Sequence, residues 1–312
     1  MKHILYAADS RFFNQLYISA FSLCQNQRSQ DYVLHVIEED FTEEQKDRLR
    51  GMAEAHGQAL IFYRKPELPA GTTVSFGRSR ATYYRLSAAA LLPDTVEKVL
   101  YLDGDTVIED SLDELFALDL GESEAAAVQD VRKAEDLAVI GLTPADCYLN
   151  AGVLLLNLTA WRKKHTETRC ADYLAARNYS LPYNDQDVLN AVCHGKMRIL
   201  PLRYNVMIPV LRFTSEQIQR WAGIEKFYPE KERLEAARHP AVIHYAGTPF
   251  DRPWNDVCDH PLKDRFWFYA AKAELSFSPV RTETSGAARL RRKLFRALPV
   301  TVQLGIRTML RR

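Results

Sequence analysis

Short apolar runs alternate with amphipathic segments along most of the chain. Residues 4–8, 32–37 and 59–63 are predicted strands. Between them, segment 14–25 has helical spacing of apolar positions, and a capping box at 42–45 predicts a charged helix to about residue 56. Further strands are predicted at residues 99–102, 125–129, 154–157, 196–200 and 241–243. Short strands that alternate with helices are typical of a mostly parallel, doubly wound sheet with helices on both faces. We therefore predict an α/β fold.

The strand predicted at residues 99–102 ends in an acidic turn, Asp103-Gly104-Asp105. Ligands of open α/β sheets bind off the carboxyl ends of the strands, so a site is expected here. Two carboxylates separated by one glycine can face a single hard cation, which also accepts phosphate oxygens. The alternative, a solvated acidic turn, stays open on these residues alone.

Polar residues also follow other predicted strands. Asp130 ends the strand at 125–129, and His244 ends the last one. A lone aspartate in such a place is an ordinary helix cap, and a lone histidine is an ordinary buried side chain. His244 nevertheless occupies the same kind of position as Asp103 and Asp105, on the carboxyl edge of the sheet.

Small residues accompany two further polar candidates. Ala8 and Asp9 close the first strand, where a planar ring can approach the backbone and Asp9 offers an acceptor, although a helix cap explains Asp9 equally well. Asn150 and Gly152 precede the strand at 154–157. Gly152 permits close backbone approach, and Asn150 supplies both a donor and an acceptor.

Two predicted helices carry the remaining candidates. Asp185 and Gln186 open the helix that begins near residue 184, where acidic residues are favoured by the helix dipole. A helix start on this edge also directs polar side chains toward the pocket. Arg85 lies in the helix predicted at 78–92, and its guanidinium suits a phosphate or a carboxylate.

Charge is unevenly distributed, although the formal net charge of the 312 residues is only +1. Residues 281–312 contain nine Lys/Arg and one acid, a net charge of +8, so the remaining residues carry −7. Leu290, Leu294 and Leu298 follow at i, i+4 and i+8, which predicts a basic amphipathic helix. We expect a catalytic-type domain at 1–275 and a tail at 276–312 that contacts an anionic membrane surface, with a flexible solubilising tail as the alternative.

Five cysteines are scattered through the chain without C-x-x-C spacing. They predict free thiols in a reducing compartment and no zinc site. The apolar run at residues 1–8 is too short for a signal peptide, and no stretch is long and uncharged enough to span a bilayer. A cytoplasmic protein is expected, and no nucleic-acid partner.

The ordered set of motifs resembles glycosyltransferase family 8, in particular its bacterial lipopolysaccharide galactosyl- and glucosyltransferases. The matching pieces are AAD at 7–9, TYYRL at 82–86, VLYLDGDTV at 99–107, D at 130, NAGVLLLNL at 150–158, NDQDVLN at 184–190 and HYAG at 244–247. The resemblance implies a GT-A, Rossmann-like domain that binds Mn²⁺ or Mg²⁺ and a UDP-sugar. It further implies retaining transfer of galactose or glucose to a glycan or lipid-linked acceptor, such as lipopolysaccharide core, at the inner face of the membrane.

The resemblance also implies a role for individual residues. Metal ligands are expected at Asp103, Asp105 and His244. Donor contacts are expected at Ala8, Asp9, Arg85, Asp103, Gly104, Asn150, Gly152, Gly247 and Arg252. Catalytic positions around the transferred sugar are expected at Asp130, Asp185 and Gln186, with Gln186 nearest the anomeric carbon. One departure from the family is the loop HYAGTPFDRPW, which is two residues longer than the family pattern HYxGxxKPW and has Arg252 in place of lysine.

Two mechanisms and two other functions stay open on the sequence. Gln186 is a poor nucleophile, which favours attack on the departing face over two successive displacements. The altered loop leaves open a protein that binds UDP-sugars without transferring them. A metal-dependent phosphotransferase is the weakest alternative. The related Asp-x-Asp-x-Thr motif of haloacid-dehalogenase-like phosphatases does not fit, because Thr106 comes one position too early and several predicted elements precede the motif.

Overall fold

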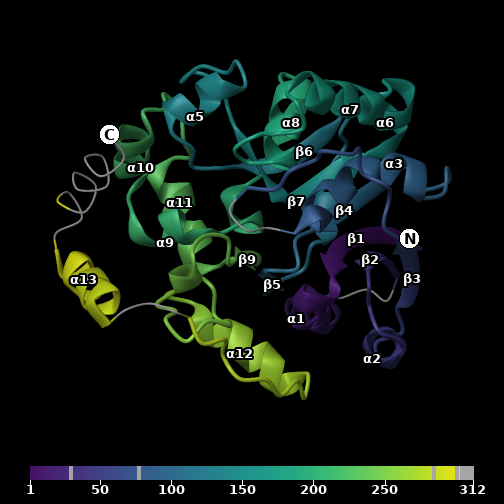
Figure 1. Cartoon of the computed structure of the whole chain (residues 1–312), viewed down its shortest axis with the longest axis horizontal. Coiled ribbons are helices and arrows are strands. Elements are labelled where there is room, and N and C mark those ends of the chain that lie inside the picture. The colour runs from purple at the N-terminus through teal and green to yellow at the C-terminus, as the bar shows by residue number, and fades with distance from the viewer. Residues whose placement is uncertain (28–30, 76–78, 283–285, 299–301, 303–312) are drawn as a thin grey trace.

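A mostly parallel sheet forms the centre of the computed structural model, which describes residues 1–27, 31–75, 79–282, 286–298 and 302 (Figure 1). Within these residues its strand order is β3-β2-β1-β4-β7-β6-β8, and β7 alone runs antiparallel to its neighbours. The strands are β1 (Lys2–Asp9), β2 (Tyr32–Glu39), β3 (Ala59–Arg64), β4 (Lys98–Leu102), β6 (Ala125–Gln129), β7 (Leu149–Asn157) and β8 (Met197–Ile199). The predicted α/β class and mostly parallel sheet are confirmed.

Helices cover both faces of this sheet, as expected. The α-helices are α1 (Phe13–Asn26), α2 (Glu43–Ala55), α3 (Ala88–Leu91), α4 (Asp113–Ala117), α5 (Ala134–Val139), α6 (Leu158–Lys163), α7 (Thr166–Ala176), α8 (Asp185–Val192), α9 (Ile208–Arg212), α10 (Ser215–Ala222), α11 (Glu230–Arg238), α12 (Lys263–Lys272) and α13 (Gly286–Ala297). Short 3₁₀ helices are η1 (Ser10–Phe12), η2 (Arg80–Ser87), η3 (Leu202–Tyr204) and η4 (Pro249–Asp251). Figure 1 shows α1 and α2 on the opposite side of the sheet from α6, α7 and α8.

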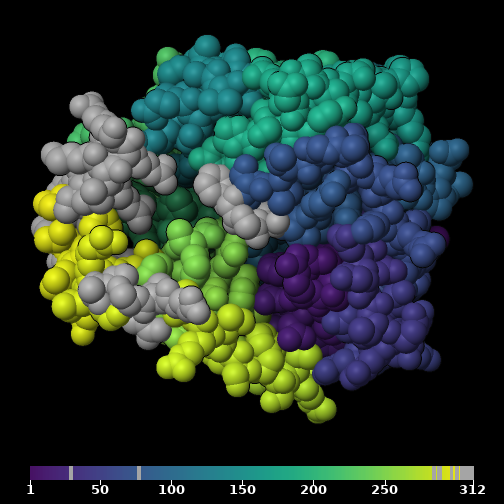
Figure 2. Space-filling model, viewed as in Figure 1, coloured from purple at the N-terminus to yellow at the C-terminus, as the bar shows by residue number. Residues whose placement is uncertain are grey.

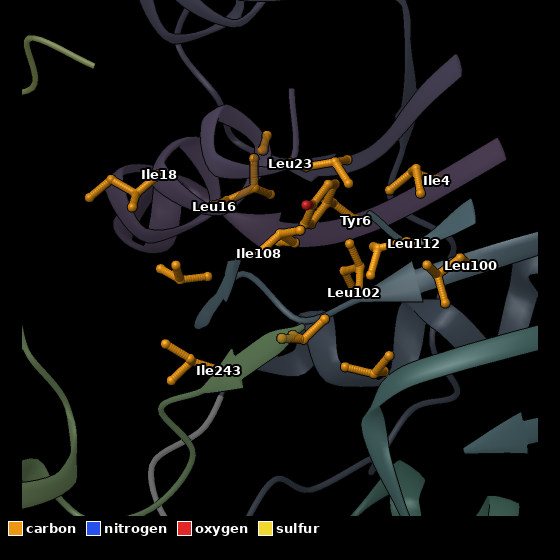
Figure 3. Close-up of a cluster of buried hydrophobic side chains, with 14 of the residues drawn as sticks. Ile4, Tyr6, Leu16, Ile18, Leu23, Leu100, Leu102, Ile108, Leu112 and Ile243 are labelled. Atoms are coloured by element: carbon orange, nitrogen blue, oxygen red, sulfur yellow. The ribbon is translucent and has the colours of Figure 1, made fainter. Parts of the chain in front are cut away.

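Apolar side chains that alternate along the strands divide the core between the two faces. On one face Leu16 and Leu23 of α1 lie over Ile4 and Tyr6 of β1 (Figure 3), and Leu102 of β4 belongs to the same cluster. The opposite face is filled from α3, α6, α7 and α8. The central strands are buried on both sides and therefore read as continuous apolar runs.

A second, two-stranded sheet brings His244 to the acidic turn. β5 (Thr106–Ile108) follows Asp105 directly and pairs antiparallel with β9 (Val242–His244), with Thr106 opposite His244. The sequence predicted the strand near 241–243 but not β5, because three residues after a turn give too little pattern. This pairing fixes a distant histidine beside the two aspartates.

Several boundaries differ from the predictions. β7 begins at Leu149, so Asn150 and Gly152 lie inside the strand and not ahead of it. The helix expected at 78–92 is mostly the 3₁₀ helix η2, and its first residue lies outside the described residues. The segment 131–148, where no helix was predicted, contains α5, and the stretch after residue 204, also without a predicted helix, contains α9–α11.

The C-terminal helix α13 lies at one side of the molecule, away from α12 (Figure 1). The predicted tail helix is present over Gly286–Ala297, whereas the tail residues 283–285, 299–301 and 303–312 lie outside the described part. Residues near position 250 pack beside the N-terminal ones (Figure 2), where the rings of Phe12 and Trp254 meet edge to face at 5.7 Å. Among the described residues, every helix is too short or too polar to cross a membrane.

Candidate functional site

A pocket of about 330 Å³ opens at the carboxyl ends of the parallel strands. It is lined by all the predicted site residues except Asp130 and Gly152, which contact residues that do line it. The lining residues among the predictions are Ala8, Asp9, Arg85, Asp103, Gly104, Asp105, Asn150, Asp185, Gln186, His244, Gly247 and Arg252. Residues from seven separate stretches of the chain thus meet at one edge of the sheet, as the strand-end argument predicted.

Two carboxylates and one imidazole form a compact cluster in this pocket. His244 Nε2 lies 3.1 Å from Asp105 Oδ1 and 3.7 Å from Asp103 Oδ2. One ligand atom from each residue lies within 4.8 Å of the other two. Gly152 leaves room for this cluster, because a Cβ there would lie 2.2 Å from His244 Cε1. Two carboxylates and an imidazole in a space kept open by a glycine fit a divalent cation such as Mn²⁺.

Charge is balanced within the cluster. Burial disfavours the ionised form of Asp105, but attraction to His244, their hydrogen bond and the charge of Arg252 outweigh it, so its pKa falls to about 2. Burial likewise disfavours the imidazolium of His244, yet Asp105 and Asp103 raise its pKa above the ordinary value. The two carboxylates thus favour the protonated imidazole, and a cation bound to them would favour the neutral ring.

Arg85 ties the acidic turn to the start of α8. It is 3 % exposed, and its Nη2 donates to Asp103 Oδ1 at 2.8 Å while Nε lies 2.9 Å from Asp185 Oδ2. Nη1 donates to the carbonyl of Ala151, and the guanidinium lies over the ring of Tyr101 at 4.1 Å. Burial lowers the pKa of Arg85, but attraction to Asp103 and Asp185 raises it by more. The pKa therefore lies above its ordinary value, and the guanidinium stays charged. Asp103 Oδ1 is thereby held by protein donors, which turns Oδ2 toward His244.

A buried amide network adjoins the cluster. Asn150 Nδ2 donates to Asp130 Oδ2 at 3.1 Å and to Gln186 Oε1 at 3.2 Å. Gln186 Nε2 donates to the same Asp130 oxygen at 2.9 Å. Burial raises the pKa of Asp130, but Arg132 and these amide donors lower it below the ordinary value. Asp130 is therefore an ionised carboxylate whose position is fixed by three side chains.

The start of α8 is held in an unusual backbone conformation. Asn184, which precedes the helix, has φ +55° and ψ −129°, a combination that non-glycine residues rarely adopt. Its Oδ1 accepts the backbone N–H of Ser75 at 2.9 Å. Asp185 follows and accepts a hydrogen bond from Thr82. The strained residue directs Asp185 and Gln186 into the pocket, as the helix-start interpretation predicted.

The loop after His244 presents a cation to the same pocket. Gly247 has a φ of +136°, which favours glycine, and a Cβ there would lie 2.8 Å from Asp251 Oδ2. Arg252, five residues later, lines the pocket. Its buried Nε has no hydrogen-bond partner among the described residues. The guanidinium is available for an anionic group.

Two predicted residues have local structural roles. Asp9 caps η1, because its Oδ1 accepts the backbone N–H groups of Arg11 and Phe12 at 3.1 and 3.2 Å. The helix cap considered for Asp9 is therefore present, although the residue also lines the pocket. Gly104 allows α1 to approach, since a Cβ there would lie 3.3 Å from the Leu16 Cα.

Sequence reasoning missed several residues that complete the site. Arg132 lines the pocket, pairs with Asp130 at 2.9 Å and lies over the Tyr183 ring at 4.0 Å. Asn205 Oδ1 lies at hydrogen-bond distance from His244 Nδ1, at 2.9 Å. Arg132 lies two residues after the predicted site residue Asp130, and this proximity could have identified it. The sequence around Asn205 contains no motif that could have identified that residue.

Comparison with known proteins gives consistent results. The family described as Glycosyl transferase family 8 matches residues 3–258. General stress protein A of Bacillus subtilis is 25% identical over 86% of this chain and 92% of its own length. Lipopolysaccharide 1,2-glucosyltransferase of Escherichia coli K12 is 26% identical over 83% of this chain and 74% of its own. The crystal structure of the galactosyltransferase LgtC with donor and acceptor sugar analogs matches with a TM-score of 0.72 and 26% identity, over 86% of this chain and 95% of that one.

Proposed function

The chain belongs to glycosyl transferase family 8 and is a hexosyltransferase, and we propose that its donor is a UDP-sugar. The sugar that it transfers is galactose or glucose, and the configuration at the anomeric carbon is retained. The acceptor we propose is a glycan or a lipid-linked saccharide such as lipopolysaccharide core. The observation that carries this proposal is the cluster of Asp103, Asp105 and His244 in a pocket that also contains an unpaired arginine nitrogen.

Each side of the pocket suits one part of a nucleotide-sugar. Asp103, Asp105 and His244 would hold Mn²⁺ or Mg²⁺, which when bound neutralises charge on the diphosphate. Arg252 would bind the phosphate oxygens through its guanidinium, where the family pattern has lysine. Ala8 and Asp9, at the end of β1, would receive the uridine.

The amide network would receive the sugar. Asp130 and Asp185 are carboxylates that can hold sugar hydroxyls and stabilise positive charge at the anomeric carbon. Gln186 lies between Asn150 and Asp130 through hydrogen bonds of 3.2 and 2.9 Å. An amide is a poor nucleophile, so we favour attack of the acceptor on the face from which the diphosphate leaves.

Product formation tests the proposal. The enzyme is incubated with Mn²⁺ and a panel of radiolabelled UDP-hexoses, and the anomeric configuration of the released or transferred sugar is read by NMR. We expect turnover of UDP-galactose or UDP-glucose with retention, and none in Asp103→Asn. Binding of UDP without any sugar release from the wild type would instead indicate a non-catalytic sugar-nucleotide-binding protein.

We further propose residues 1–275 as the transferase domain and 276–312 as an attachment to the anionic cytoplasmic face of the membrane. On α13, Arg292 is turned toward the body of the protein, where it pairs with Asp259 at 3.0 Å. Leu290 and Leu294 are 58 and 60 % exposed. A basic helix with its leucines directed outward is suited to the surface of anionic lipid.

Vesicle sedimentation tests the attachment. Leu290→Gln with Leu294→Gln should reduce pelleting with anionic vesicles at low salt. Leu234→Gln, which changes a leucine of 38 % exposure on α11, is the matched control. Equal pelleting of the double variant and the wild type would refute the attachment while leaving the transferase proposal intact.

A further inference from the structure

Asn205 lies between the metal-ligand histidine and the amide network, in a segment whose sequence carries no motif. It is fully buried, at 0 % exposure. The backbone beside it is fixed to β9, because Val206 N–H donates to the Val242 carbonyl at 2.8 Å and His244 N–H donates to the Val206 carbonyl at 3.0 Å. The side chain of Asn205 is therefore held at a constant position relative to the His244 ring.

Backbone N–H groups determine how each amide in this region is oriented. Gly152 N–H donates to one terminal atom of Asn150 at 2.9 Å, so that atom is the carbonyl Oδ1. The side-chain atom of Asn205 that lies 2.8 Å from this oxygen must be a donor, and it is therefore Nδ2. Independently, Ala151 N–H donates to Gln186 Oε1 at 3.0 Å, and Asn150 Nδ2 donates to the same oxygen. Reversing any one amide would bring like groups together.

The orientation of Asn205 in turn determines the state of the histidine ring. With Nδ2 directed at Asn150, the Oδ1 of Asn205 faces His244 Nδ1 at 2.9 Å. An oxygen acceptor requires an N–H on Nδ1. The other ring nitrogen, Nε2, is the one that faces Asp105 Oδ1 and Asp103 Oδ2. Hydrogen bonds of this kind behind a ligating histidine fix both the ring orientation and the tautomer.

We propose that Asn205 is a positioning residue that keeps the His244 proton on Nδ1 and so presents the Nε2 lone pair to the divalent cation held by Asp103 and Asp105. The inference rests on the metal site proposed above. It also connects that site to the sugar side of the pocket, because Asn205 contacts His244 and Asn150 at once.

Titration of the full-length protein with Mn²⁺ in the presence of UDP tests the role, with free Mn²⁺ measured by electron paramagnetic resonance. Asn205→Ala should weaken Mn²⁺ binding by about 10- to 100-fold, the usual effect of removing a hydrogen-bond partner behind a metal ligand. Asn205→Asp keeps an oxygen acceptor for Nδ1–H and should retain affinity between those of wild type and Asn205→Ala.

A control variant separates this role from simple loss of stability. Asn157 caps α6 and donates to the carbonyls of Gly121 and Ser123, at the opposite end of β7. Asn157→Ala should lower the melting temperature and leave the Mn²⁺ affinity unchanged. Wild-type affinity in Asn205→Ala, or an Asn205→Asp affinity no better than that of Asn205→Ala, would overturn the proposal. If the wild type itself bound no Mn²⁺ with UDP, the proposed metal site would be wrong and the role of Asn205 would be wrong with it, whereas a wild type that binds Mn²⁺ beside an unaffected Asn205→Ala would refute the role of Asn205 alone.

Discussion

Gly152 and His244 lie so close that no side chain fits between them. A Cβ on Gly152 would lie 2.2 Å from His244 Cε1 and 2.8 Å from Asp103 Oδ2. Glycine inside a strand is unfavourable for stability, and Gly152 sits in the middle of a buried strand. The space that His244 and Asp103 occupy beside this position is the physical reason for a glycine here.

Gly152→Ala is therefore expected to displace the His244 ring and abolish Mn²⁺-dependent transfer. Overpacking should also cost about 1–3 kcal/mol of stability, which leaves a folded protein. The measurements are Mn²⁺ affinity, initial rate and urea unfolding. Gly51→Ala is the control, since nothing lies within 4 Å of a Cβ at that helical glycine. An active Gly152→Ala enzyme would place the metal elsewhere.

Arg85 supports both Asp103 and the helix that carries Gln186. Arg85→Met leaves Asp103 and Asp185 without their buried cation and should cost about 3–5 kcal/mol. Arg85→Lys should recover part of this stability but little activity, because a single ammonium cannot reach both carboxylates and the Ala151 carbonyl. Urea unfolding and initial rates separate the two effects.

Arg220→Lys provides the comparison for Arg85, since Arg220 forms an exposed pair with Glu216 on one helix. That change should alter stability by less than about 1 kcal/mol. If Arg85→Lys were equally mild and fully active, the proposed connection that Arg85 makes between the two parts of the site would be wrong.

The sequence predicted which strand-end residues meet in the pocket, but not every element that brings them together. Asp103 and Asp105 follow a strand whose apolar run is unmistakable, and His244 ends another, so the strand-edge rule placed all three together. The pairing of β5 with β9 could not be predicted, because Thr106–Ile108 is too short to show a period. Asn205 could not be predicted either, since its role depends on two backbone N–H groups more than 50 residues away in sequence, at Ala151 and Gly152.

Stability should fall in acid through His260. This histidine is 2 % exposed, and its Nδ1 accepts the backbone N–H of Leu262 at 3.1 Å. Burial, aided by Arg212, lowers its pKa from 6.5 to about 3. Below pH 6.5 the unfolded chain binds a proton that the folded one does not, so stability is lost as the pH falls, by about 2 kcal/mol at pH 5.

His260→Asn isolates this contribution. The asparagine Oδ1 can still accept the Leu262 N–H but does not titrate. Urea unfolding at pH 7 and pH 5 should show a loss about 2 kcal/mol smaller in the variant than in the wild type. His35, whose pKa burial lowers to about 4, contributes equally to both proteins and cancels in the difference. Identical losses would mean that His260 is protonated in the folded state.

Arg292 connects the tail helix to the loop that carries Arg252. It donates to Asp259 and, at 3.2 Å, to Asp251, and it lies over the Phe250 ring at 4.1 Å. Asp251 in turn accepts the backbone N–H of Thr248 at 3.1 Å, so the arginine completes the support of the loop after Gly247.

Arg292→Gln should loosen the loop and raise the KM for the UDP-sugar by up to about fivefold, the worth of one part-exposed ion pair, with little change in kcat. Initial rates without vesicles measure this effect directly. Arg291→Gln removes the same charge from the exposed neighbouring residue and should leave KM at the wild-type value. Equal KM values for the two variants would show that the tail contributes charge to the protein but no support to the donor site.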